Sequence, residues 1–143
     1  MFTFAMPSAP GQLRKLAGAY ANVGVETSVS GASPHRLIEL LFNGFVDSIG
    51  LARVAMRAGQ IEQKGKAISR AARIIEEGLK AGLNLQEGGR LAEDLSMLYS
   101  YIAVRLTYAN SRNDEGALDE CLRLINPLRE AWSSIGPQVE GQS

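Results

Sequence analysis

The sequence predicts an all-α protein, an antiparallel up-and-down four-helix bundle with a short N-terminal helix or extended segment docked on it. Three observations favour this fold class: apolar residues recur at helical spacing, turn residues separate the repeating segments, and no stretch alternates as a strand does. A chain of 143 residues can bury a core of its own. We expect one bundle domain over residues 12–136, between a flexible lead-in at 1–11 and a flexible tail at 137–143.

Residues 12–32 form the weakest of the expected elements. Apolar residues recur at helical spacing as far as Tyr20, but glycines interrupt the segment, and each costs about 1 kcal/mol relative to alanine within a helix. A short helix followed by extended chain is therefore expected, held by docking on the bundle rather than by its own propensity. The apolar side chains available for docking are Leu16, Tyr20, Val23 and Val25.

The pair Ser33-Pro34 marks the start of the first long helix. Serine at the N-cap accepts a hydrogen bond from an otherwise unpaired amide, and proline fits the first helical position. The helix should continue to about residue 58, because Gly59 supplies the left-handed residue that ends many helices. A second helix with one apolar stripe is then expected over residues 60–83.

Two more helices complete the predicted bundle. The loop at residues 84–89 ends in paired glycines, and a regular apolar stripe begins after it. Asn113 is expected to cap the last helix, whose first turn carries Asp114 and Glu115 at the positive end of the helix dipole. These two helices supply the expected structural core residues, which are Leu91, Leu95, Leu98, Ile102, Leu106 and Trp132.

Composition argues against several classes of partner. Lys and Arg together number 15, as do Asp and Glu, so no net field favours nucleic acid or an anionic membrane. Charged residues interrupt every apolar run before it reaches the length of a membrane span, and no secretory signal is visible. The single cysteine, Cys121, cannot form an internal disulfide and fits a reducing compartment. We therefore expect a cytoplasmic protein that neither binds nucleic acid nor inserts into membranes.

Catalytic and metal-binding patterns are missing from the sequence. His35 is the only histidine, and with Glu39 on the same helix it cannot complete a metal shell or serve a catalytic triad. We expect His35 to be an exposed residue of the first turn. The prediction is a protein that is not an enzyme and has no cofactor and no metal site.

The first long helix has more apolar surface than a bundle core needs. Between residues 37 and 57 its apolar side chains cover an arc of roughly 200°, about twice the width of a core-facing stripe. An uncovered apolar arc usually marks a partner site. We expect aspartate in place of Phe42 or Phe45 to weaken binding without unfolding the bundle. The expected partner-binding residues are Tyr20, Leu37, Leu40, Leu41, Phe42, Phe45, Ile49, Ile68, Ile75 and Leu79.

The same apolar arc is compatible with two arrangements that need no foreign partner. The helix can be the central one, enclosed by the other three, or two copies of the chain can pair through it. A helical dimerisation or regulatory adaptor module using the same apolar face is thus the alternative function, and the protein is expected to be a monomer or a weak homodimer.

Several stretches of the sequence closely resemble the flagellar secretion chaperone family, FliS. The resemblance extends from about residue 19 to residue 135. It is carried by AYANVGVETSVSGASPHRLIELLFNGF at 19–45, KGKAISRAARIIEEGLKAGLN at 64–84, LYSYIAVRLTYANSRND at 98–114 and EAW at 130–132. The chain departs from the family pattern at Asn43, Ser100 and Val104, each of which removes a charge.

The resemblance implies a cytosolic export chaperone. Such a protein binds the disordered C-terminal segment of flagellin, prevents its premature polymerisation and delivers it to the type III secretion gate for flagellum assembly. In the family the N-terminal tyrosine segment folds over part of the flagellin-binding surface, and Tyr20 and residues 37–45 match those positions. The flagellar export gate protein and the anti-sigma factor are implied as further partners.

Overall fold

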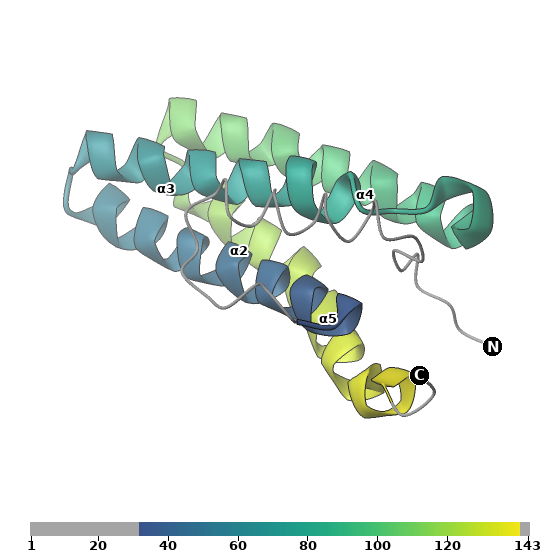
Figure 1. Ribbon diagram of the computed structural model, residues 1–143. Helices are drawn as coiled ribbons and strands as arrows, with labels where there is room; N and C mark the ends of the chain where they lie inside the picture. The colour runs from purple at the N-terminus through teal and green to yellow at the C-terminus, as the bar shows by residue number, and fades with distance from the viewer. Residues whose placement is uncertain (1–31, 141–143) are drawn as a thin grey trace.

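The computed structural model describes residues 32–140, with side chains described as far as Ile135 (Figure 1). Within that range every regular element is helical, which confirms the predicted all-α class. The expectations for the lead-in at 1–11, for Tyr20 and its docking segment, and for the tail at 137–143 concern residues outside the described side chains.

The first described helix, α2, spans Pro34–Arg57 and begins and ends as the sequence predicts. Ser33 is the N-cap, and its hydroxyl accepts a hydrogen bond of 3.1 Å from the amide of Arg36. Gly59 has a φ of 71°, the left-handed conformation that lets the chain reverse into the next helix.

The second predicted helix consists of two segments of different geometry. Helix α3 spans Ile61–Arg73, and the chain continues directly as a π-helix, η1, over Ile74–Lys80. A π segment has one more residue in each hydrogen-bonded ring than an α-helix. Apolar periodicity does not reveal such a local change of helical pitch, so the π segment was not predicted from the sequence.

Helix α4 spans Leu85–Arg112 but is broken near its start at Gly89, where φ is 57° and ψ is −137°. The segment before the break is a helical turn rather than the predicted open loop. Its first turn is capped by Asn84, whose side-chain oxygen accepts a hydrogen bond of 3.0 Å from the amide of Glu87. The paired glycines thus mark a sharp kink, after which the long straight part of α4 begins.

Helix α5 spans Glu115–Glu140. The predicted cap at Asn113 is wrong: with φ at 53° and ψ at 44°, Asn113 ends α4 in the left-handed conformation. Asp114 caps α5 instead, because its carboxylate accepts a hydrogen bond of 3.2 Å from the amide of Ala117. The buried Lys64 stabilises the same junction by donating to the carbonyl of Asn110 and to the side chain of Asn113.

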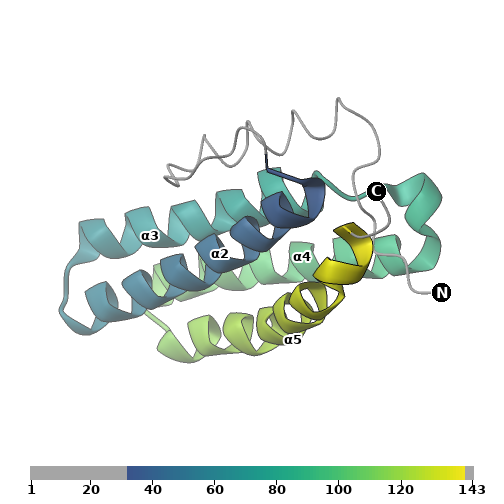
Figure 2. The ribbon, with the colours of Figure 1, turned by 60° about the horizontal axis from the view of Figure 1, so that its bottom comes forward.

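The helices pack in the cyclic order of an up-and-down bundle. Helix α2 lies between α3 and α5, while α4 closes the ring on the opposite side against α3, η1 and α5 (Figures 1 and 2). One continuous core cluster draws side chains from all these elements. Helix α2 is therefore the helix whose surroundings decide where a partner could bind.

Candidate partner-binding site

The inward side of α2 carries most of the residues that were predicted from the sequence to bind a partner. Leu41, Phe45 and Ile49 have no accessible surface, and Leu37 and Phe42 retain only a few per cent. Ile68, Ile75 and Leu79 face them from α3 and η1 and are equally buried within the same cluster. In this structure these residues form core contacts, so a partner would reach them only if α2 moved.

Close packing of α2 on η1 depends on Gly78. A Cβ atom at that position would lie 2.9 Å from Cδ2 of Leu41, closer than side chains approach in folded proteins. Only glycine therefore lets the two helices meet at this distance. The contact encloses Leu41, a residue that was predicted to line an open groove.

The burial of Phe42 and Phe45 also changes one expectation. Aspartate in place of either phenylalanine would put a carboxylate into an apolar core without a partner, which costs several kcal/mol. Such variants would unfold the bundle instead of weakening binding selectively. A charge placed on the outward side of α2 provides the informative test.

The outward side of α2 is defined by Leu40, Asp47, Leu51 and Val54. At about 100° per residue these four positions fall within about 60° of one another. Leu51 and Val54 are 59% and 66% exposed, which makes them the two large exposed hydrophobic residues of the helix. Leu40 lies on the same side but is buried. We refer to Leu40, Leu51 and Val54 as the outer strip.

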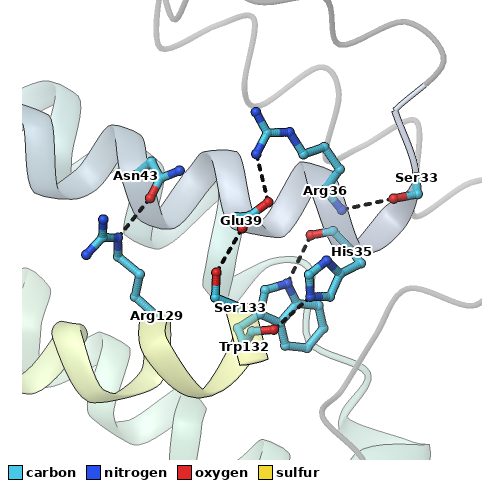
Figure 3. Close-up of polar contacts among 8 residues, drawn as sticks. All are labelled: Ser33, His35, Arg36, Glu39, Asn43, Arg129, Trp132 and Ser133. Carbon is cyan, nitrogen blue, oxygen red and sulfur yellow. Dashed lines mark hydrogen bonds and ion pairs between the residues drawn. The ribbon is translucent and has the colours of Figure 1, made fainter. Parts of the chain in front are cut away.

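The N-terminal end of α2 is fixed by contacts with α5 (Figure 3). His35 stacks on Trp132, with ring centroids 4.8 Å apart. Nε2 of His35 lies 2.7 Å from the carbonyl oxygen of Trp132, and the indole nitrogen of Trp132 donates to the carbonyl oxygen of His35 at 2.9 Å. The expectation of an exposed first-turn histidine is therefore wrong, because His35 is buried against Trp132.

Two further polar contacts join the same pair of helices (Figure 3). Arg129 donates from Nε to the side-chain oxygen of Asn43 at 2.8 Å, so the neutral amide still holds this arginine. Ser133 donates to Glu39, which also accepts from Arg36. The hydrogen bond from Arg36 lowers the pKa of the Glu39 carboxyl below its usual value.

The C-terminal end of α2 is joined to the start of α5 by ion pairs. Arg57 pairs with Glu115, and Arg53 contacts both Glu115 and Asp119. The hydrogen bond from Arg57 lowers the pKa of Glu115 below its ordinary value. Helix α2 is thus held along its α5 side by polar contacts at both ends, while the outer strip faces away from them.

Helix α4 has a second set of exposed apolar residues, which was not predicted from the sequence. Met97, Tyr101, Val104 and Tyr108 are all exposed and lie on the side of α4 opposite its buried residues. Their spacing of four, three and four is visible in the sequence, but it runs beside a stronger core stripe on the same helix. Of the predicted core residues, Leu95, Ile102, Leu106 and Trp132 are buried, whereas Leu91 and Leu98 are partly buried against the core.

Titratable groups do not gather into a reactive centre among the described residues. No three side chains of His, Cys, Asp or Glu within 32–135 stand close enough to share a metal ion. Burial raises the pKa of the Cys121 thiol to about 12 and raises the pKa of Tyr99 above its usual value. No helix in the described part of the chain is long and apolar enough to span a bilayer.

Comparison with known proteins assigns the chain to a family. The family model described as "Flagellar protein FliS" matches residues 16–139. The flagellar secretion chaperone FliS of Salmonella typhimurium strain LT2 is 46% identical over 124 residues, which cover 87% of this chain and 92% of that protein. The flagellar secretion chaperone FliSB of Pseudomonas aeruginosa is 42% identical over 81% of this chain and 91% of its own length. The flagellar secretion chaperone FliS of Escherichia coli K12 is 38% identical over 85% of this chain and 90% of its own length.

Proposed function

The chain belongs to the FliS family of flagellar secretion chaperones, and on that premise we propose that it binds the disordered C-terminal segment of flagellin along α2. Binding keeps the newly made flagellin from polymerising and presents it for export during flagellum assembly. The export gate protein and the anti-sigma factor of the flagellar regulon are proposed as further partners. The protein acts in the cytoplasm and catalyses no reaction.

The observation that carries this proposal is the apolar surface on the outward side of α2. Leu51 and Val54 are more than half exposed, and Leu40 continues their strip toward the start of the helix. An exported subunit has an apolar segment that is disordered before assembly, and covering that segment can offset its ordering cost of roughly 2–5 kcal/mol. An amphipathic segment lying along an apolar helix face is a common mode of peptide recognition.

The binding residues predicted from the sequence take different parts in this proposal. Leu40 lies on the outward side beside Leu51 and Val54 but is buried, so it contacts the flagellin segment only when its own cover is displaced. The enclosed residues Leu37, Leu41, Phe42, Phe45, Ile49, Ile68, Ile75 and Leu79 support the strip from beneath, and they contact the segment only if α2 shifts away from its neighbours. Tyr20 and the segment 12–32 compete with flagellin for the same surface, and the domain over residues 12–136 acts as one unit.

Calorimetric titration with a peptide of the cognate flagellin C-terminus tests the outer strip. We expect Leu51→Glu and Val54→Glu each to weaken binding about tenfold or more, since a carboxylate would be buried against an apolar partner. Both sites are exposed, so thermal unfolding should change little. Leu85→Glu is the matched control, because Leu85 is 53% exposed but lies at the start of α4.

Three results would count against the proposal. Full affinity in both α2 variants would remove the outer strip from the binding surface. Equal weakening by Leu85→Glu would show that any added carboxylate has the same effect. No heat of binding for the unmodified protein with the flagellin peptide would refute the proposed partner itself.

A further inference from the structure

Helices α3 and α4 lie side by side, and an open hollow of about 520 Å³ follows their shared edge (Figures 1 and 2). Its lining residues come from α3, apart from Asn110 of α4. Helix α2 supplies no lining residue, so this hollow lies apart from the outer strip. We refer to it as the α3–α4 hollow.

Three cations line the α3–α4 hollow. Lys66, Arg70 and Arg73 follow one another at intervals of four and three residues, which places them on one side of α3. Their Cα atoms form a row roughly 10 Å long, given the rise of an α-helix. One wall of the hollow is therefore lined with positive charge, although the chain as a whole has equal numbers of acidic and basic residues.

The middle cation of this row has no acidic partner within the described part of the chain. Lys66 pairs with Glu62 at 3.8 Å and Arg73 with Glu77 at 3.6 Å, and such surface pairs contribute little to stability. Arg70 forms no ion pair with any described residue, and its Nε is buried without an acceptor there. Buried N–H groups are nearly always hydrogen-bonded in folded proteins, so this donor indicates an acceptor from outside the bundle.

The donors around Arg70 suit a carboxylate that belongs to a polypeptide. A guanidinium presents a planar fork of N–H groups, which matches the two oxygens of a carboxylate. The hydroxyl of Ser69 and the side-chain amide of Asn110 line the same hollow and can donate to a further oxygen or to a peptide carbonyl. Lys66 and Arg73 can accept a second acidic side chain on either side of the first.

The chain's own ends do not provide such an acidic segment. Residues 1–31 contain Arg14 and Lys15 but only one acidic residue, Glu26, and residues 136–143 contain a single acidic residue. Like charges would therefore oppose docking of the N-terminal segment on the row of cations. The acceptor for Arg70 should come from another protein.

A nucleic acid fits the hollow less well than an acidic peptide does. The row has only three cations, and Glu62 and Glu77 stand near its two ends. A continuous polyphosphate would bring its next charges against these carboxylates, whereas a peptide can carry two acids and be neutral beyond them.

We propose that the α3–α4 hollow binds an acidic segment of a partner protein, with one carboxylate on the guanidinium of Arg70 and a second acid on Lys66 or Arg73. In an extended segment, acids two residues apart are separated by roughly 6–7 Å along the chain. This separation is close to the rise of roughly 6 Å between Lys66 and Arg70 on α3. Because α2 does not line the hollow, the acidic segment binds whether or not the outer strip is occupied.

A titration of the ¹⁵N-labelled full chain with a capped peptide, Gly-Ser-Glu-Gly-Glu-Gly-Glu-Ser-Gly, tests the proposal by NMR. We expect the resonances of Arg70 Nε–H and of the Asn110 side-chain amide to shift, with a Kd of about 1 mM or somewhat below, since few ion pairs form. The same peptide with glutamine in place of glutamate should cause no shift. Raising the salt concentration from about 0.05 M to about 0.5 M should weaken binding several-fold, because salt screens surface charges.

Variants of Arg70 distinguish a bidentate contact from a general effect of charge. Arg70→Gln should weaken binding of the acidic peptide about fivefold or more, and Arg70→Lys should weaken it less, because lysine keeps the charge but lacks the fork. Arg90→Gln is the matched control, since Arg90 is exposed on α4 and forms no ion pair with a described residue. Arg70→Gln should leave calorimetric titration with the flagellin peptide unchanged, so a failure of one proposal is separable from a failure of the other.

Several results would overturn the proposal. Resonances that stay unshifted up to about 5 mM peptide would remove the site, as would an equal response to the glutamine peptide or equal weakening by Arg90→Gln. Loss of flagellin-peptide binding in Arg70→Gln would make the hollow part of the flagellin surface. Tighter binding of a short oligothymidylate would assign the hollow to nucleic acid, and shifts on raising the protein concentration alone would assign it to a second copy of the chain.

Discussion

Helices α2 and α4 both have apolar residues on more than one side, yet neighbouring helices cover α2 far more completely than α4. Helix α2 buries twelve of its 24 residues, while α4 buries only six of its 28. Helix α2 is enclosed by α3, η1 and α5, and among its large apolar residues only Leu51 and Val54 are exposed. On α4, by contrast, four large hydrophobic residues remain exposed along the straight part of the helix: Met97, Tyr101, Val104 and Tyr108. Apolar surface in a sequence therefore does not by itself tell which helix offers a free face.

The largest expected difference between the two helices is in stability. Phe45→Ala on α2 should lower the free energy of unfolding by about 3–5 kcal/mol, since it leaves a cavity in a fully buried site. Val104→Ala on the exposed side of α4 should change the free energy of unfolding by less than about 0.5 kcal/mol. Urea unfolding followed by circular dichroism at low protein concentration measures both. Similar losses of unfolding free energy in Phe45→Ala and Val104→Ala would contradict the expected difference between the two helices.

Alanine substitutions at two glycines should give stability changes of intermediate size. Gly78→Ala should destabilise the protein by about 1–3 kcal/mol, because the new methyl group meets Leu41 of α2. Gly65→Ala should stabilise it by up to about 1 kcal/mol, since a Cβ atom there has no neighbour within 4 Å and alanine favours the helix. Thermal unfolding of both variants beside the parent is sufficient. A stable Gly78→Ala variant would show that α2 is packed less closely than described.

The smallest expected effect concerns a carboxyl that contacts Tyr101 on the exposed side of α4. Glu120 of α5 accepts hydrogen bonds from Tyr101 and Arg105, and the bond from Tyr101 is the main cause of its lowered pKa. A lowered pKa in the folded state adds stability above the pKa of the unfolded state, and this contribution is lost as pH falls through the folded value. Tyr101→Phe should move the pKa of Glu120 back up toward its ordinary value. An NMR titration of the Glu120 carboxyl carbon measures this pKa. An unchanged pKa in Tyr101→Phe would show that the hydrogen bond from Tyr101 is not the main cause of the shift.

Much of the fold was predictable because local signals set it. Ser33 and Gly59 mark the ends of α2 through capping and backbone conformation, which depend on the residues themselves. Two errors are local: the cap expected at Asn113 is at Asp114, and the loop expected at residues 84–89 is a helical turn. The other errors concern features that depend on contacts between distant segments. His35 is buried because Trp132 covers it, and η1 packs against Leu41 through Gly78, and neither pairing is visible in spacing along the chain.

The candidate site was only partly predictable for the same reason. The apolar excess on α2 was evident, but the sequence did not tell which of its residues face α3 and η1 and which face outward. Leu51, at the edge of the apolar arc, is exposed, whereas Phe45 within it is enclosed. Pattern alone measures how much of a helix is apolar, and only the packing of neighbouring helices decides which part a partner can reach.

The π-helix η1 bears on how this bundle tolerates changes of chain length. A π turn accommodates one residue more than an α turn, so it has the form of a single-residue insertion that the surrounding helix has absorbed. Deleting one residue between Ile74 and Lys80 should therefore restore regular α geometry while the stretches before and after keep their relative orientation. Inserting a residue without such a π turn would instead rotate one stretch by about 100° relative to the other. The irregular pitch is thus the means by which two stretches of one helix keep the same side inward.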